Sequence, residues 1–163
     1  MKRSLRYIPV FFLALMLAAC DSSDHEGNAE VFSFPIRFDV DDADRNDNVL
    51  SQQFNVPEIT PDVVRHGAVL VYFKEQGTWT AMPYTYGVES VSEPLVDYTV
   101  TLGYAFDTRF LEVFYETSAD PRDIPLPSSV DMKVVIINSL PIGKNAIDLR
   151  DYEAVKRYYG LDD

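Results

Sequence analysis

Cys20 is the only cysteine in the chain, and its surroundings point to a specific use of its thiol. It follows Leu17-Ala18-Ala19, and upstream lie three basic side chains within residues 2–6 and an apolar stretch at residues 8–17. That stretch is too short to cross a bilayer as a helix, and small residues precede the cysteine. The pattern predicts a secretory signal peptide at residues 1–19, with Cys20 opening the mature chain.

The run Leu17–Cys20 resembles the lipobox of bacterial lipoproteins. In that family a signal peptidase cuts before the cysteine, and acyl chains are attached to its sulfur and its new amine. The resemblance therefore implies lipidation of Cys20. The competing interpretation is a plain secretory signal with a free thiol, which would be unusual in an oxidising compartment. If Cys20 is acylated, no thiol remains for a disulfide, a cysteine-bound metal or a cysteine nucleophile. We expect no cofactor.

The segment after the cysteine is polar and has no apolar period, so residues 20–30 are interpreted as a flexible tether and residues 31–163 as a single domain. Asp21, directly after the cysteine, looks like an inner-membrane retention signal of enteric-type bacteria. The acidic, serine-rich run at residues 21–24 looks instead like a surface-export signal of Bacteroidota-type lipoproteins. We favour the second interpretation, which predicts a location at the outer membrane and allows exposure at the cell surface.

Net charge limits the partners. The formal charge is −12, and removal of the three basic residues of the leader makes it −15. A body this acidic is repelled by nucleic acid and by anionic headgroups. We therefore expect no nucleic-acid partner and attachment to the membrane through the N-terminal lipid. The sequence does not indicate which protein or glycan would be the partner.

The acidic segment at residues 39–48 is a candidate calcium site. Asp42, Asp44 and Asn46 stand at alternate positions and could supply three of the six to eight oxygens that Ca²⁺ requires. The match to an EF-hand loop is partial, because Asp47 stands where glycine is needed and Gln53 where a bidentate glutamate is needed. The competing interpretation is a solvated hairpin loop rich in turn-forming residues.

Catalysis and sugar binding have weaker support. His66 is the only histidine outside the tether, and its place before Gly67 favours a helix-terminal role over catalysis, so we expect no enzyme activity. Aromatic rings could stack on sugar faces if they shared an exposed surface. The competing interpretation places Trp79 in the core and leaves each tyrosine with a buried ring and a hydrated hydroxyl. The rings concerned are Trp79, Tyr72, Tyr84, Tyr86, Tyr98, Tyr104 and Tyr115.

The rest of the chain reads as short strands separated by turn residues, which predicts an all-β, antiparallel, immunoglobulin-like sandwich of about seven strands. Pro35 indicates an edge strand or a strand with a bulge, and the segment at 49–56 could pair back onto the one at 31–38. The runs at 68–73 and 130–138 are apolar on both faces, which is typical of buried strands. The other expected strands are 78–86, 97–106 and 109–117, the last two forming a hairpin.

Two helical segments are expected. Thr60 followed by Pro61 predicts a short helical turn near residues 61–66, which Gly67 could end. A C-terminal helix is expected near residues 149–159, with Asp148 as its cap and Gly160 as its stop. Its apolar stripe should lie against a sheet. The stripe consists of Leu149, Tyr152, Val155 and Tyr159.

Several segments together resemble a group of uncharacterised Bacteroidota-type envelope lipoproteins. They are FNVPEIT at 54–60, HGAVLVY at 66–72, Trp79 with MPY at 82–84, KVVII at 133–137 and DYEAVKRYYG at 151–160. This resemblance implies a location and a fold rather than an activity. Our hypothesis is a lipid-anchored envelope protein with a non-enzymatic binding or structural domain. The alternative is a carbohydrate- or calcium-binding module at the cell surface.

Overall fold

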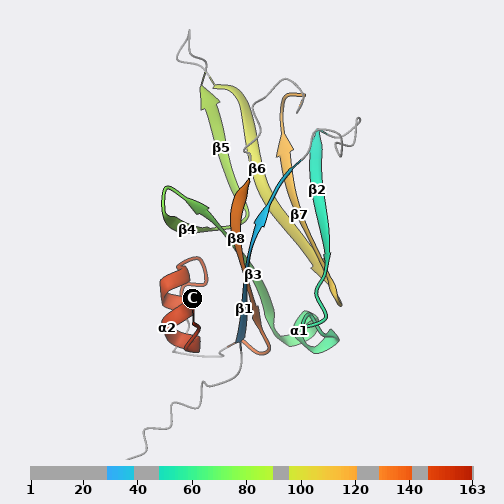
Figure 1. Cartoon of the computed structure of the whole chain (residues 1–163), viewed down its shortest axis with the longest axis vertical. Coiled ribbons are helices and arrows are strands. Elements are labelled where there is room, and N and C mark those ends of the chain that lie inside the picture. Colours follow the sequence, from blue (N-terminus) through green and yellow to red (C-terminus); the bar gives the residue numbers. More distant parts are fainter. Residues whose placement is uncertain (1–28, 39–47, 90–95, 121–128, 141–146, 163) are drawn as a thin grey trace, which may run out of the picture.

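Two four-stranded antiparallel sheets pack face to face in the computed structural model, which describes residues 29–38, 48–89, 96–120, 129–140 and 147–162 (Figure 1). The first sheet contains, in spatial order, β1 (Ala29–Ile36), β8 (Val130–Ile137), β3 (Ala68–Glu75) and β4 (Thr78–Ala81). The second sheet contains β2 (Val49–Asn55), β7 (Phe110–Thr117), β6 (Val96–Asp107) and β5 (Tyr84–Glu89). The all-β sandwich predicted from the sequence is confirmed.

The two sheets differ in how they are buried. In the second sheet, alternate residues such as Val100 and Leu102 face the core, whereas Thr99 and Thr101 between them are more exposed. The first sheet is buried on both faces, because the sandwich core covers one face and the C-terminal helix covers the other. This double burial accounts for the continuous apolar runs in β3 and β8.

The pairing predicted for the first two strands is wrong. β1 pairs with β8, with Phe34 opposite Met132, and β2 pairs with β7, with Phe54 opposite Leu111. The two strands therefore belong to opposite sheets and meet only through side chains, since the rings of Phe34 and Phe54 lie 5.1 Å apart. β1 is an edge strand, as Pro35 indicated. Alternation shows which face of a strand is buried but does not identify its neighbour.

The single strand expected at residues 78–86 is two strands. β4 ends at Ala81 in the first sheet, and β5 begins at Tyr84 in the second. Met82 and Pro83 carry the chain from one sheet to the other, and Met82 is buried while its N–H donates to Val71 O (2.9 Å). Pro83 has no N–H to donate to a ladder. The sandwich therefore has eight described strands.

The short helix α1 (Pro61–His66) lies where it was predicted and closes one end of the sandwich (Figure 1). Thr60 caps it by accepting a hydrogen bond from Val63 N–H (3.3 Å). Ile59 and Val63 are fully buried and fill the space between the ends of the two sheets. Gly67 ends the helix, because its N–H donates to Val63 O (2.9 Å).

The C-terminal helix α2 (Tyr152–Tyr159) begins three residues later than predicted. Asp151, not Asp148, is its cap and accepts from Ala154 N–H (3.1 Å). Asp148 instead forms a turn before the helix, in which its carboxylate accepts from Arg150 N–H (3.0 Å). Gly160 ends the helix in the left-handed conformation (φ 63°), as expected.

The N-terminal boundary of the domain also differs from the prediction. β1 begins at Ala29, two residues before the predicted boundary at residue 31.

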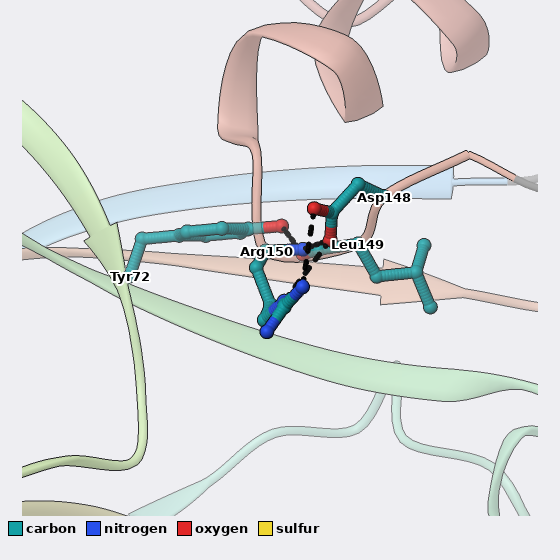
Figure 2. A network of polar contacts seen from close by, with 4 residues as sticks. All are labelled: Tyr72, Asp148, Leu149 and Arg150. Atoms are coloured by element: carbon teal, nitrogen blue, oxygen red, sulfur yellow. Dashed lines mark hydrogen bonds and ion pairs between the residues drawn. The ribbon is translucent and has the colours of Figure 1, made fainter.

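A buried tyrosine fastens the segment before α2 to the first sheet. Tyr72 is fully buried, and its hydroxyl donates to Leu149 O (2.6 Å), beside the exposed Asp148–Arg150 pair (Figure 2). Burial raises the pKa of Tyr72 well above its usual value, because the phenolate would lose its hydration. The neutral phenol is therefore the form that the fold stabilises.

This raised pKa predicts a loss of stability in alkali. Above about pH 10 the unfolded chain releases the proton of Tyr72 while the folded chain keeps it, so stability falls as pH rises. One such tyrosine contributes a slope of about 1.4 kcal/mol per pH unit in that range. Tyr72→Phe should lose about 1 kcal/mol at pH 7 with the hydrogen bond, yet show a shallower decline above pH 10. Urea unfolding from pH 7 to 11 measures both, and parallel curves for the two proteins would contradict the expectation.

Candidate ligand-binding cleft

A cleft of about 390 Å³ opens between the two sheets at the end opposite α1. Five strands contribute to it, namely β3 and β8 from the first sheet and β5, β6 and β7 from the second. Its apolar walls include Phe73, Leu102 and Val130. Its polar groups come from Tyr86, Tyr115, Ser129, Glu75 and Asp131.

The lengths of the strands account for the position of the cleft. β4 has only four residues, whereas β5 and β6 extend beyond it at the upper end of Figure 1. The inner face of the second sheet therefore lacks a full cover at this end. Tyr84 and Tyr86 occupy that inner face as half-buried neighbours, with ring centroids 5.9 Å apart. Tyr84 also contacts Phe73 across the sandwich (5.3 Å).

Two tyrosine hydroxyls meet in the cleft. The side chains of Tyr86 on β5 and Tyr115 on β7 are hydrogen-bonded to each other across β6, on the inner face of the second sheet. Tyr115 is 2% exposed, and Tyr86 is half-buried. Burial raises the pKa of both phenols, and for Tyr115 the neighbouring Tyr86 adds to the effect. Both hydroxyls are therefore neutral over the physiological range and can donate and accept hydrogen bonds.

The charged groups of the cleft are mainly acidic. Glu75 and Asp131 are exposed and line it from the ends of β3 and β8, and Glu75 shares the inner face with Phe73, whereas Asp131 lies between the inward-facing Val130 and Met132 and so belongs to the outer face. Lys74 also lines it, but its ammonium lies 5.4 Å from the centroid of the Trp79 ring. Its positive charge is thus engaged at that ring by a cation–π contact. The cleft therefore combines hydroxyls and carboxylates with an apolar wall.

A second cleft, of about 310 Å³, is a weaker candidate for a ligand site. It lies between the edge strands β1 and β2 and is lined mainly by apolar groups, including Phe32, Phe34 and Phe54. Of its polar residues, Asn55 ends β2 and Glu58 belongs to the chain between β2 and α1. Ligand sites usually join apolar walls to several convergent polar groups. The cleft beside Tyr86 fits that description better.

The aromatic residues singled out in the sequence divide into two groups. Five of them lie on the inner face of the second sheet and pack against the sandwich core; they are Tyr84, Tyr86, Tyr98, Tyr104 and Tyr115. Tyr72 and Trp79 lie on the outer face of the first sheet, against α2. Trp79 is half-buried and contacts Tyr152 (5.9 Å), so its expected place in the sandwich core is wrong. The rings do not form one common surface.

His66 is placed at the end of α1, away from the cleft. Its side chain is exposed, and Nδ1 lies 3.1 Å from Asp62 Oδ1, one helical turn earlier. Its position in the last turn of a short helix matches the helix-terminal role expected from the sequence. Among the residues that the structure describes, no group of three or more His, Cys, Asp or Glu could hold a metal ion. The calcium candidates Asp42, Asp44 and Asn46, and the lipidation candidate Cys20, lie outside the described residues.

Sequence reasoning did not find the polar residues of the cleft. Glu75, Ser129 and Asp131 stand at strand ends and look like ordinary solvated residues in the sequence. They gather at one site only because β3 and β8 are neighbours in the first sheet. The contact between Tyr86 and Tyr115 likewise depends on how β5, β6 and β7 are aligned. No local pattern carries that information.

Comparisons with known proteins give no identity: no protein-family model, curated protein sequence or solved structure matches this chain. In the described part of the chain, no helix is long and apolar enough to cross a membrane.

Proposed function

We propose that this protein is a lipid-anchored, non-enzymatic binding protein of the bacterial cell envelope, and that the cleft beside Tyr86 is its ligand site. The observation that supports the proposal best is the position of the cleft relative to the N-terminus of the domain. Ala29, where β1 begins, pairs with Ile137 at the α1 end of the sandwich. Ile36, where β1 ends, pairs with Val130, which lines the cleft.

If Cys20 carries the lipid, the cleft would lie at the end of β1 farther from the anchor. Eight residues of β1 span roughly 25 Å, so a lipid at Cys20 would hold the α1 end nearer to the membrane. The cleft would then face away from the bilayer, where a ligand can reach it. Acylation of both the sulfur and the amine would supply at least two chains, which is enough for stable anchoring. The acidic body would not bind anionic lipid by itself.

A catalytic role has less support. His66, the histidine that a Ser-His-Asp triad would require, is exposed on α1 at the end opposite the cleft. The cleft itself offers carboxylates and neutral phenols but has no histidine among its lining residues.

Calcium binding and sugar binding are the two other candidate functions. Calcium binding depends on Asp42, Asp44 and Asn46. Sugar binding has a specific structural argument, because the hydroxyl pair and the apolar wall occupy one cleft.

The anchor is tested by replacing Cys20 with serine, which removes the atom to be acylated. We expect the wild-type protein in the membrane fraction and Cys20→Ser in the soluble fraction or as an unprocessed precursor. Ser22→Ala, in the same segment, serves as the control and should leave the partition unchanged. Cell fractionation followed by mass spectrometry of the N-terminal peptide measures both. An unmodified Cys20 in the wild-type protein, or an unchanged partition of Cys20→Ser, would contradict the proposal.

A further inference from the structure

In the Tyr86–Tyr115 hydroxyl pair, only one of the two hydroxyl protons can be donated within the pair. When two phenols hydrogen-bond to each other, one donates to the other, and the proton of the second phenol must point elsewhere. Tyr115 is almost fully buried, whereas Tyr86 is half-buried at the cleft. A ligand that displaces water here binds better if it offers an acceptor to this proton, because an unpaired buried donor costs about 1–3 kcal/mol.

The carboxylate of Glu75 requires the opposite hydrogen-bonding partner. Ionised Glu75 can only accept hydrogen bonds, so a ligand that contacts it must supply a donor. This carboxylate also repels anions, which disfavours phosphorylated or uronic acid ligands. A simple ammonium ion would satisfy the carboxylate, but it has no apolar face to place against the walls of the cleft. Uncharged hydroxyl groups donate and accept at once.

The walls add a third requirement. Phe73, Leu102 and Val130 give the cleft an apolar side, and the ring of Tyr86 lies among the polar groups. A ligand that fits must therefore carry an apolar face together with its hydroxyls. The volume of about 390 Å³ falls at the small end of the roughly 300–1,000 Å³ range of ligand sites. This size suits a short ligand rather than a long polymer chain.

We propose that the cleft binds a neutral saccharide, with the Tyr86–Tyr115 hydroxyl pair and the carboxylate of Glu75 as its polar contacts. The inference rests on the proposed binding function and names the ligand class of the same site. A sugar ring carries hydroxyls that donate and accept around its edge, and it presents an apolar C–H face to an aromatic or aliphatic wall. It thus meets all three requirements of the cleft together.

The test is calorimetric titration of the full mature chain, carrying Cys20→Ser for solubility. Five probes cover the competing classes: maltotriose, cellotriose and xylotriose as neutral saccharides, trigalacturonate as an anion, and trilysine as a cation. We expect at least one neutral trisaccharide to bind, with an affinity that changes little between 50 and 500 mM salt. We expect no binding of trigalacturonate or trilysine.

Two matched variants locate the binding site. Tyr86→Phe removes one hydroxyl from the cleft and should weaken binding about 5- to 10-fold, the effect of one neutral hydrogen bond. Tyr104→Phe makes the same chemical change at a hydroxyl that donates to Val69 O (2.9 Å), outside the lining of the cleft, and should leave affinity unchanged. Glu75→Gln keeps the size of a side chain that lines the cleft and should also weaken binding. Thermal unfolding establishes that each variant is folded.

The remaining outcomes separate this inference from the proposed function. Failure of all three neutral trisaccharides to bind, or equal effects of Tyr86→Phe and Tyr104→Phe, would overturn the saccharide inference. Binding of trilysine that Tyr86→Phe weakens would also overturn it, while leaving the cleft as a binding site for a cationic ligand. The lipid anchor is tested separately, by the partition of Cys20→Ser between the membrane and soluble fractions.

Discussion

Replacing Tyr152 with alanine is expected to lower the free energy of unfolding by about 3–5 kcal/mol, the range seen when large buried aromatic side chains are truncated. Tyr152 is 2% exposed and is the first residue of α2. Its ring contacts Tyr72 (5.2 Å) and Trp79 (5.9 Å) on the outer face of the first sheet. The truncation would open a cavity where α2 meets the sheet.

A buried cation makes this position more sensitive. Lys133 is 5% exposed, its Nζ lies 4.4 Å from the centre of the Tyr152 ring, and it donates to Tyr152 Oη (2.9 Å). Alanine at position 152 would remove both contacts from a charge that has little access to water. Tyr152→Phe keeps the ring and should cost only about 1.5–3 kcal/mol, the range for a hydrogen bond to a charged group.

Urea unfolding followed by circular dichroism measures these differences. Trp79→Ala provides a comparison from the same cluster, and we expect a smaller loss of about 1–3 kcal/mol because Trp79 is only half-buried. We expect Tyr152→Ala to lower the free energy of unfolding more than Trp79→Ala does. This ranking follows from burial and not from side-chain size. A loss below 1 kcal/mol for Tyr152→Ala would mean that α2 contributes little to the stability of the sandwich.

Replacing Gly67 with alanine is the second change with a large expected effect, a loss of about 3 kcal/mol or more. Gly67 joins α1 to β3, and a β-carbon there would collide with the carbonyl oxygen of Ile137. It would also lie 3.0 Å from Asn138 O and 3.1 Å from Val63 Cα. All three atoms belong to the backbone, so relief requires α1 to move away from β8. Gly67 has a negative φ (−102°), so the cost is steric rather than conformational.

Gly103→Ala is the matched control for this effect. A β-carbon at Gly103 would also meet a neighbour at close range, but that neighbour is the ring of Phe114, a half-buried side chain on the outer face of the second sheet. The ring can turn towards solvent, so we expect a loss of about 1 kcal/mol. Thermal and urea unfolding compare the two variants. A loss at Gly67 no larger than that at Gly103 would show that α1 shifts easily.

Local patterns predicted much of the secondary structure correctly. Thr60 followed by Pro61 fixed the start of α1, because a capping hydroxyl and a preset φ act within a single turn. Gly160 ended α2 for a similarly local reason, since the left-handed conformation costs glycine little. The alternation in β6 identified which of its residues face the core. All three predictions depend on residues only a few positions apart.

Predictions that depend on distant partners were less successful. The sequence did not show that β1 and β2 belong to opposite sheets, nor that the chain changes sheets at Met82 and Pro83. Asp148 and Asp151 are both good caps, and the choice between them depended on where Tyr152 packs against the first sheet. Trp79 was expected in the core, but β4 turns it towards α2 instead.

The amino-acid sequence by itself determined the strand-rich character of this protein, the faces of its strands and the ends of α1, because short-range sterics and hydrophobic periodicity decide these features. Only the tertiary structure decided the cleft. Tyr86, Tyr115 and Glu75 come from three separate strands, and they line one cleft because of sheet order and unequal strand length. Those two properties arise from pairing between segments far apart in the chain, which no local pattern of residues encodes.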